Sequence, residues 1–196
     1  GSGAAGITAA LAARGVIGPD GSARPVPRDA PAVVLLNNER RLGLKILVSG
    51  GGRCNLTNAR VDEHDYQTDA PHVLRGLLRG YSAQVARSYF EQRGCKTYEE
   101  PLGKVFPRSN KARDVLQVLL GDVQRAEIPL LAPAEVTRLT PPTAPGHGWR
   151  VTLSDESSWS AQRVILATGG MSLPKTGSRG FGLTALAELG HDMAPS

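Results

Sequence analysis

The alternation of apolar and polar positions predicts helices and strands that follow one another along the chain. Residues 4–14, AAGITAALAAR, are alanine-rich and carry Ile7 and Leu11 at i,i+4 spacing, and Gly15 follows where a helix would end. Residues 32–36, AVVLL, form a continuous apolar run that is typical of a buried parallel strand. A helix followed by such a strand indicates an α/β fold.

The middle of the sequence is predicted to be helical, and the last third mainly strand. Ser82 is a candidate N-cap, and Val85, Tyr89 and Phe90 lie on one face of the helix that follows it. Residues 16–31 hold four prolines and two glycines, which predicts an irregular excursion or an exposed hairpin. The further predicted elements are an extended arm over residues 98–107, a helix over residues 109–126 and a three-stranded meander over residues 129–166 that ends in a parallel-type strand at residues 164–167.

Composition narrows the possible partners. The chain has 196 residues, of which 40% are apolar and 21% charged, as in soluble globular proteins. Its net charge is +5, but basic residues are spread along the chain and aromatic residues make up 5%, so we expect no nucleic-acid partner. No apolar run approaches the roughly 20 residues of a membrane span and no secretory leader opens the sequence, so we expect no membrane partner and a cytoplasmic location.

Candidate metal and nucleophile sites are weak. The two cysteines, Cys54 and Cys95, lie in unrelated contexts without a CxxC motif or a histidine at ligand spacing, so we expect neither a metal site nor a disulfide framework. Arg53 precedes Cys54 and could lower the pKa of its thiol, which leaves a redox-active cysteine as a minor alternative. The sequence identifies no catalytic side chain.

Glycines open the chain in a pattern typical of dinucleotide binding. GSGAAG places Gly1, Gly3 and Gly6 before a predicted helix, where a tight turn, close approach of a pyrophosphate and close helix packing are needed. A strand normally delivers the chain into such a turn, and none precedes this one, so we expect a fragment that lacks its first strand. A Rossmann unit presents an acid to the ribose after its second strand, and here Asn37 and Asn38 follow that strand.

A second glycine-rich stretch follows the apolar run at residues 46–48. Three consecutive glycines are retained where φ is positive or where the backbone touches a ligand without an intervening Cβ. The next residues supply a cation, amides and hydroxyls, which suit an anionic ligand rich in heteroatoms. A phosphate-binding hydrolase is an alternative, but the stretch lacks the GK[ST] ending of a P-loop. The residues concerned are Gly50, Gly51, Gly52, Arg53, Cys54, Asn55, Thr57 and Asn58.

Four blocks in this order carry a resemblance to a known family: GSGAAG, VVLLNNERRLGLKILVSGGGRCNLTN, GKVFPRSNKARDVL and VILATGGMSLPKTGS. The chain resembles the NAD(P)/FAD-dependent oxidoreductases of the HI0933-like and BaiN flavoprotein family. The resemblance implies a flavoprotein with two dinucleotide-binding domains, in which a Rossmann-type domain holds FAD. It also implies that Val136 meets the adenine through its backbone and that the chain returns to FAD at Ala167, Thr168, Gly169 and Gly170.

The predicted FAD site thus combines three stretches with the Asn37–Asn38 pair and Val136. The sequence departs from the family pattern in its missing first strand, the 16–31 excursion, Asn37 in place of an acid, and Arg179 and Phe181 in GSRGFG. The complete predicted set is Gly1, Gly3, Ala4, Ala5, Gly6, Asn37, Asn38, Gly50, Gly51, Gly52, Arg53, Cys54, Asn55, Thr57, Asn58, Val136, Ala167, Thr168, Gly169 and Gly170.

These observations together predict a partial α/β flavoprotein. We expect a Rossmann half over residues 1–62, a helical insertion over residues 63–128, and a β-meander that returns to the FAD domain over residues 129–196, with the C-terminal substrate domain absent. The expected function is FAD-dependent hydride or electron transfer to or from a small molecule, with NAD(P)H as a candidate donor. The alternative is a non-catalytic nucleotide-binding or regulatory module, or an inactive truncated flavoprotein. Substrate and oligomeric state are not predicted.

Overall fold

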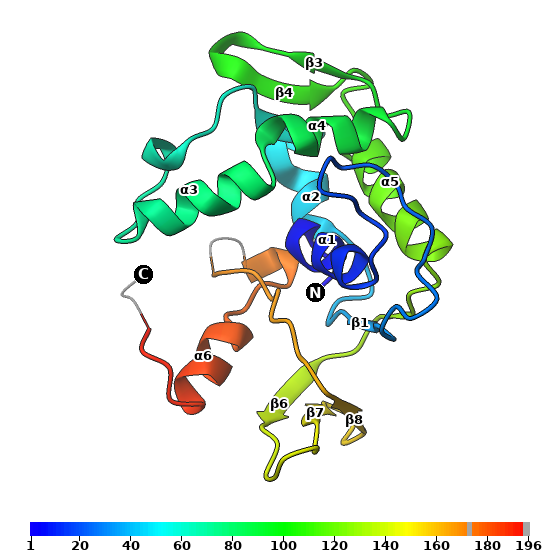
Figure 1. Ribbon diagram of the computed structural model, residues 1–196, viewed down its shortest axis with the longest axis vertical. Helices are drawn as coiled ribbons and strands as arrows, with labels where there is room; N and C mark the ends of the chain where they lie inside the picture. The colour runs from blue at the N-terminus through cyan, green and yellow to red at the C-terminus, as the bar shows by residue number, and fades with distance from the viewer. Residues whose placement is uncertain (172–173, 194–196) are drawn as a thin grey trace. The chain divides into compact units, whose positions relative to one another are not determined.

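A computed structural model describes residues 1–171 and 174–193 (Figure 1). Its elements belong to two compact units. The first unit comprises Gly1–Ala10, Val33–Lys45 and Ile128–Ser196, and the second comprises Leu11–Ala32 and Ile46–Glu127. Helices α1 (Ala4–Ala13) and α2 (Leu44–Val48) contain residues of both units. The predicted three-segment division of the chain stays a prediction.

The first unit is built on a short parallel pair and an antiparallel meander. Strand β1 pairs in parallel with β5, Leu35 opposite Leu130 and Leu36 opposite Leu131. The meander has the order β6-β7-β8, and a register shift lies between Val136 and Arg138. The elements of this unit are β1 (Leu35–Leu36), β5 (Leu130–Leu131), β6 (Val136–Thr140), β7 (Trp149–Leu153), β8 (Ser158–Ala161), the 3₁₀ turn η4 (Pro174–Thr176) and α6 (Phe181–Glu188).

The second unit packs helices against a small antiparallel sheet of order β2-β4-β3. Val105 and Phe106 of the central strand are buried, as are Val115, Leu116 and Leu119 of the longest helix. The elements are the 3₁₀ turn η1 (Ser49–Gly52), β2 (Thr57–Asn58), η2 (Glu63–Asp65), α3 (Pro71–Gly80), α4 (Ala83–Glu91), β3 (Thr97–Glu99), η3 (Pro101–Gly103), β4 (Lys104–Pro107) and α5 (Ala112–Arg125).

Local sequence signals placed several elements correctly. Helix α1 ends as predicted, and Gly15 has a φ of 78° and donates its backbone N–H to Ala12 at 2.9 Å. Ser82 caps α4 by accepting a 3.2 Å hydrogen bond from the N–H of Val85. The 16–31 excursion is irregular, with an isolated antiparallel bridge between Ile17 and Ala23.

Two predictions about parallel strands need correction. The strand expected over residues 32–36 is reduced to Leu35–Leu36, and residues 164–167 form no strand. A strand is defined by backbone pairing, and residues 164–167 have no ladder partner in the part of the chain that the structure describes. The predicted arm at residues 98–107 is the hairpin of β3 and β4 with a 3₁₀ turn at its tip. The fold class is mixed α/β, with parallel and antiparallel sheets.

The described helices also bear on the membrane prediction. Over residues 1–171 and 174–193, none combines the length and the apolar character that crossing a bilayer requires.

Candidate functional site

The glycine turn at the start of the chain packs against the predicted return segment. A Cβ placed on Gly1 would lie 2.6 Å from the carbonyl oxygen of Ala167, and a Cβ on Gly6 would overlap the carbonyl oxygen of Gly1. The same Cβ on Gly6 would lie 3.4 Å from Cβ of Ala167. Glycine is therefore required at both positions because backbone atoms occupy the space of a side chain.

The second contact of the turn is a hydrogen bond to Asn37. The backbone N–H of Ser2 donates to Oδ1 of Asn37 at 2.9 Å, and Nδ2 of Asn37 donates to the carbonyl oxygen of Glu39 at 2.6 Å. Ser2 and Asn37 are 2% and 6% exposed, so both groups are shielded from water. The hydroxyl of Ser2 also accepts from the N–H of Gly43 at 3.2 Å. Sequence reasoning overlooked Ser2, although a small polar residue between two glycines was a signal for it.

Asn38 and Glu39 connect the end of β1 with residues 177–179. Nδ2 of Asn38 donates to the carbonyl oxygen of Gly177 at 2.9 Å. A Cβ on Gly177 would lie 2.6 Å from Cγ of Glu39, and the guanidinium of Arg179 lies 3.3 Å from the Glu39 carboxylate. Glu39, the acid that follows Asn37 and Asn38 in the sequence, is thus a partly exposed carboxylate paired with Arg179.

The return segment packs against Ser178, which precedes α6, and against Gly182 in the first turn of α6. A Cβ on Gly182 would overlap the hydroxyl of Thr168, and one on Gly169, whose φ is 73°, would lie 2.5 Å from the hydroxyl of Ser178. Gly170 is exposed and has no atom within 4 Å of a Cβ position. Val136 pairs with Leu153 in the meander of the same unit.

The first turn of α1 leaves room beside the glycine turn. Ala4 and Ala5 are exposed at the N-terminus of the helix, and a Cβ on Gly3 would meet nothing within 4 Å. Gly3 has no positive φ that would itself require glycine. The open side of Gly3 and the helix N-terminus are the surface that an anionic ligand would approach.

The triple glycine in the second unit has positive φ angles, which is one of the two explanations that the sequence left open. The φ angles of Gly50, Gly51 and Gly52 are 55°, 67° and 86°, and Cys54 also has a positive φ, of 64°. A Cβ on Gly50 would lie 2.8 Å from both the backbone nitrogen of Asn55 and Cε1 of Phe106. Backbone conformation and close packing within the unit therefore explain this glycine run in part.

Arg53 is engaged by residues of its own unit. Its guanidinium lies 2.6 Å from the Glu100 carboxylate and 4.1 Å from the centroid of the Phe106 ring. Hydrogen bonds to Glu100 are the main reason that the pKa of Arg53 is raised and, reciprocally, that the pKa of Glu100 is lowered. These contacts orient the side chain, which remains 39% exposed.

Burial, rather than the charge of Arg53, has the larger effect on the pKa of the Cys54 thiol. The residue is 6% exposed, and desolvation raises the pKa of its thiol, which opposes the lowering suggested by the neighbouring Arg53. Asn55 is exposed, Thr57 lies in β2, and the Asn58 amide donates to the carbonyl oxygen of Leu102 at 2.8 Å.

The predicted cofactor residues thus fall into two sets. The first unit brings the glycine turn together with Asn37 and Ala167 and holds Gly3, Ala4, Ala5, Asn38, Val136, Thr168, Gly169 and Gly170 as well. The second unit contains the eight residues from Gly50 to Asn58 that were predicted. Their role in binding FAD stays a prediction.

Comparisons with known proteins identify relatives that match most or all of the chain. The chain is 33% identical to the 3-dehydro-bile acid delta(4,6)-reductase of Clostridium scindens over 195 residues, 100% of this chain and 44% of the relative. It is 27% identical to the ribosomal RNA dihydrouridine synthase of Haemophilus influenzae and 26% identical to that of Escherichia coli, each over 164 residues. These alignments cover 84% of this chain and 41% and 40% of the relatives, respectively.

The chain therefore spans less than half the length of these curated relatives. The family described as the HI0933-like protein Rossmann domain matches over residues 1–196, which is the whole chain. This protein belongs to the HI0933-like Rossmann domain family.

Proposed function

We propose that this chain forms the FAD-binding part of an FAD-dependent oxidoreductase that accepts electrons from NAD(P)H. The observation that carries the proposal is the meeting of the glycine turn, Asn37 and Ala167 in one unit. Three segments separated by more than 30 residues each converge where a Rossmann-type site needs a phosphate turn, a strand end and a return segment.

The residues of the first unit fit the chemistry of a dinucleotide. Gly3 is open on the side where a Cβ would point, so a pyrophosphate could approach the backbone there, beside the N-terminus of α1. The Asn37 amide is occupied by Ser2 and by a backbone carbonyl, and Glu39, which also pairs with Arg179, is the carboxylate that could accept from ribose hydroxyls. Bound FAD would supply the redox chemistry, and the chain would bind and orient it.

The names of the relatives suggest a reaction class for a protein that contains this chain. A bile acid reductase and a dihydrouridine synthase both have names that describe addition of hydrogen to an unsaturated substrate. We therefore propose that the reaction is reduction of a carbon–carbon double bond in a small molecule. As separate proposals, carried over from the sequence, the protein acts in the cytoplasm and has no membrane partner. The name of the dihydrouridine synthases includes ribosomal RNA, so the expected absence of a nucleic-acid partner needs its own test.

The test of the proposed function uses the purified full-length protein. Noncovalently bound FAD would give absorption near ~450 nm that bleaches when NADH or NADPH is added anaerobically and returns with oxygen. A protein that neither retains FAD nor binds it on titration would contradict the proposal.

A second candidate, a nucleotide-binding module without turnover, is favoured by one observation. Position 37 holds an amide in place of an acid, and both polar atoms of that amide are engaged inside the protein. Such a module would bind a dinucleotide but would leave bound flavin oxidised in the presence of either nicotinamide donor.

The loop of the second unit can be tested separately by matched substitutions. If the loop binds flavin, Arg53→Ala and Asn55→Ala will alter flavin retention or reduction more than Lys104→Ala does. Lys104 is an exposed cation of the same unit and a suitable control. Equal behaviour of all three variants in titration and stopped-flow reduction would assign Arg53 a structural role through Glu100 and Phe106.

A further inference from the structure

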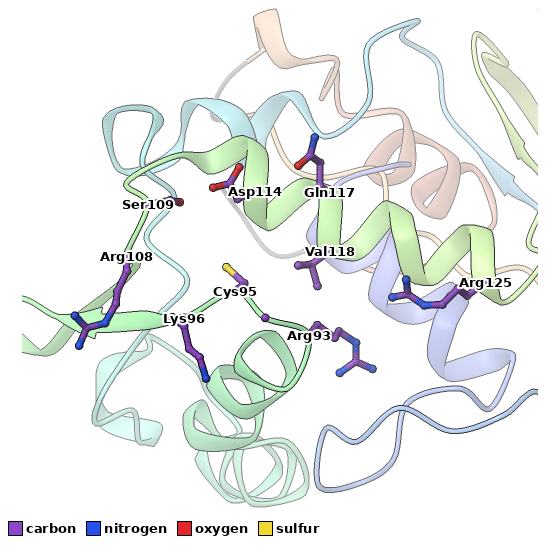
Figure 2. Close-up of a pocket in the computed structure, with 10 residues that line it drawn as sticks. Arg93, Cys95, Lys96, Arg108, Ser109, Asp114, Gln117, Val118 and Arg125 are labelled. Carbon is purple, nitrogen blue, oxygen red and sulfur yellow. The ribbon is translucent and has the colours of Figure 1, made fainter.

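A pocket of about 480 Å³ lies in the second unit between the turn after α4 and the face of α5 (Figure 2). Figure 2 shows Asp114, Gln117, Val118 and Arg125 on α5, with Arg93, Cys95 and Lys96 on the opposite side and Arg108 and Ser109 at the end of β4. None of the residues predicted to bind FAD lines this pocket. Its volume is within the range of sites that hold small organic ligands.

Positive charge is concentrated in the pocket. Lys96 and Arg108 are exposed, and neither makes an ion pair with any residue in the ranges 1–171 and 174–193. Arg93 and Arg125 share one carboxylate, that of Asp122. The pocket is lined by four cations and by one carboxylate, that of Asp114. Even with Asp122 counted, positive charge is in excess, and an oxyanion would offset it.

Arg93 also has a hydrogen-bond donor without a partner. Its side chain is 6% exposed, its Nε lies 2.5 Å from the Asp122 carboxylate, and its Nη1 donates to the carbonyl oxygens of Gly21 and Tyr89. Nη2 is buried and makes no hydrogen bond to any residue that the structure describes. The guanidinium also lies 3.7 Å from the centroid of the Tyr89 ring, so Arg93 is a fixed positive charge at the wall of the pocket.

The neutral and acidic groups indicate what the anion is attached to. Ser109 and Gln117 offer a hydroxyl and an amide, and Asp114 offers a carboxylate that can accept hydrogen bonds from ligand hydroxyls. Arginine is well suited to phosphate, because one guanidinium can donate two parallel hydrogen bonds to two phosphate oxygens. We propose that this pocket binds a phosphate group carried by a hydroxyl-bearing ligand, either a free nucleotide or the sugar-phosphate chain of RNA. This site goes beyond the proposed FAD function.

The experiment uses the full-length protein saturated with FAD, so that the proposed cofactor site is not available to the probe. Uridine monophosphate, inorganic pyrophosphate and a short oligouridylate are each titrated by calorimetry, and acetate at the same ionic strength serves as the control anion. We expect saturable binding of uridine monophosphate or oligouridylate, weakened about tenfold or more by Lys96→Glu combined with Arg108→Glu.

The charge-matched control combines Lys104→Glu with Arg113→Glu, two exposed cations of the same unit that do not line the pocket. It should change the dissociation constant by no more than about twofold, because exposed charges outside a binding site are screened by salt. Equal weakening by the two double variants, or no saturable binding of either uridine ligand, would overturn the proposal. All four substituted side chains are exposed, so neither double variant should have the folding defect that is expected when the buried Arg93 is replaced.

Two further measurements define the ligand. Pocket-dependent oligouridylate binding that uridine monophosphate displaces assigns the site to a single nucleotide unit, whereas binding of oligouridylate alone assigns it to an RNA strand. Asp114→Asn removes a negative charge, so pyrophosphate should bind more tightly. The affinity for uridine monophosphate should rise less, because the ligand hydroxyls lose an acceptor. An equal rise in affinity for both probes would contradict the proposal that the ligand carries hydroxyls.

Discussion

The backbone N–H of Ser2 donates a 2.9 Å hydrogen bond to the side chain of Asn37, which lies 35 residues away in sequence. Because both residues are buried, Asn37→Ala would leave this N–H without a partner or with a trapped water. We expect a loss of about 1–3 kcal/mol in the free energy of unfolding, measured by urea denaturation without added FAD. Asn55→Ala is the control, since Asn55 is exposed and should lose little. Equal losses in the two variants would contradict this structural role of Asn37.

Two helical glycines should respond oppositely to alanine. Gly6→Ala places a Cβ against the Gly1 carbonyl, and backbone atoms cannot yield as a flexible side chain can. Gly76 lies inside α3 with a helical backbone and open space around a Cβ position, so Gly76→Ala should stabilise the protein by about 0.5–1 kcal/mol through helix propensity. Thermal unfolding of both variants checks this contrast, and a stabilised Gly6→Ala variant would show that the turn does not pack as described.

The buried cluster in the second unit should make a large contribution to stability. The Asp122 carboxylate accepts 2.5 Å hydrogen bonds from the Tyr89 hydroxyl and from Nε of Arg93, and its side chain is 7% exposed. Asp122→Ala leaves Arg93 as a buried charge without its counterion, so we expect a loss of about 3–5 kcal/mol. Tyr89→Phe removes one hydrogen bond to a charged group and should lose about 1.5–3 kcal/mol.

The double variant of Tyr89 and Asp122 controls for this interpretation. Because the two residues share one network, the loss in the double variant should be smaller than the sum of the single losses. Strict additivity in urea denaturation would indicate that the two side chains act independently.

Stability should fall at alkaline pH. Burial raises the pKa of the Cys54 thiol, so the folded state keeps a proton that the unfolded state releases above its ordinary pKa of about 8.5. The unfolded state then binds fewer protons, and the free energy of unfolding decreases as pH rises, by up to about 1.4 kcal/mol per pH unit for this group. The same sign applies to Tyr89, whose pKa is raised by desolvation and then by its hydrogen bond to Asp122.

The pH dependence can be assigned with Cys54→Ala. Denaturation between about pH 8 and 10 should give a shallower decline for this variant than for the unchanged protein. An identical slope in both proteins would mean that the thiol ionises equally in the folded and unfolded states.

The sequence predicted features that depend on neighbouring residues. The alanine-rich run gave α1, Ser82 gave a cap and the triple glycine gave positive φ angles, because each is decided within a few residues. Contacts between segments that are far apart in the chain could not be predicted in this way, because no local sequence pattern marks them. Nothing in the spacing joined Arg53 to Glu100, 47 residues apart, or Tyr89 to Asp122, 33 residues apart.

Strands were predicted less well because apolar runs do not specify their partners. Residues 32–36 and 164–167 have the composition of buried strands, but pairing decides where a strand exists. In the described structure only Leu35 and Leu36 of these runs find a partner, in β5. The return of the chain at Ala167 was expected from the family resemblance, whereas Ser2 was overlooked in the sequence and its bond to Asn37 was found in the structure.

FAD binding by a Gly3→Val variant tests the central claim most directly. Gly3 is open in the ligand-free turn, so valine there should leave the fold intact and block only the approach of a pyrophosphate to the backbone. The measurement is FAD titration of the full-length protein and of this variant, followed at ~450 nm, with unfolding curves recorded alongside. We predict flavin binding by the unchanged protein and none by an equally stable Gly3→Val variant. Undiminished flavin content in Gly3→Val would contradict the assignment of this turn as the phosphate site.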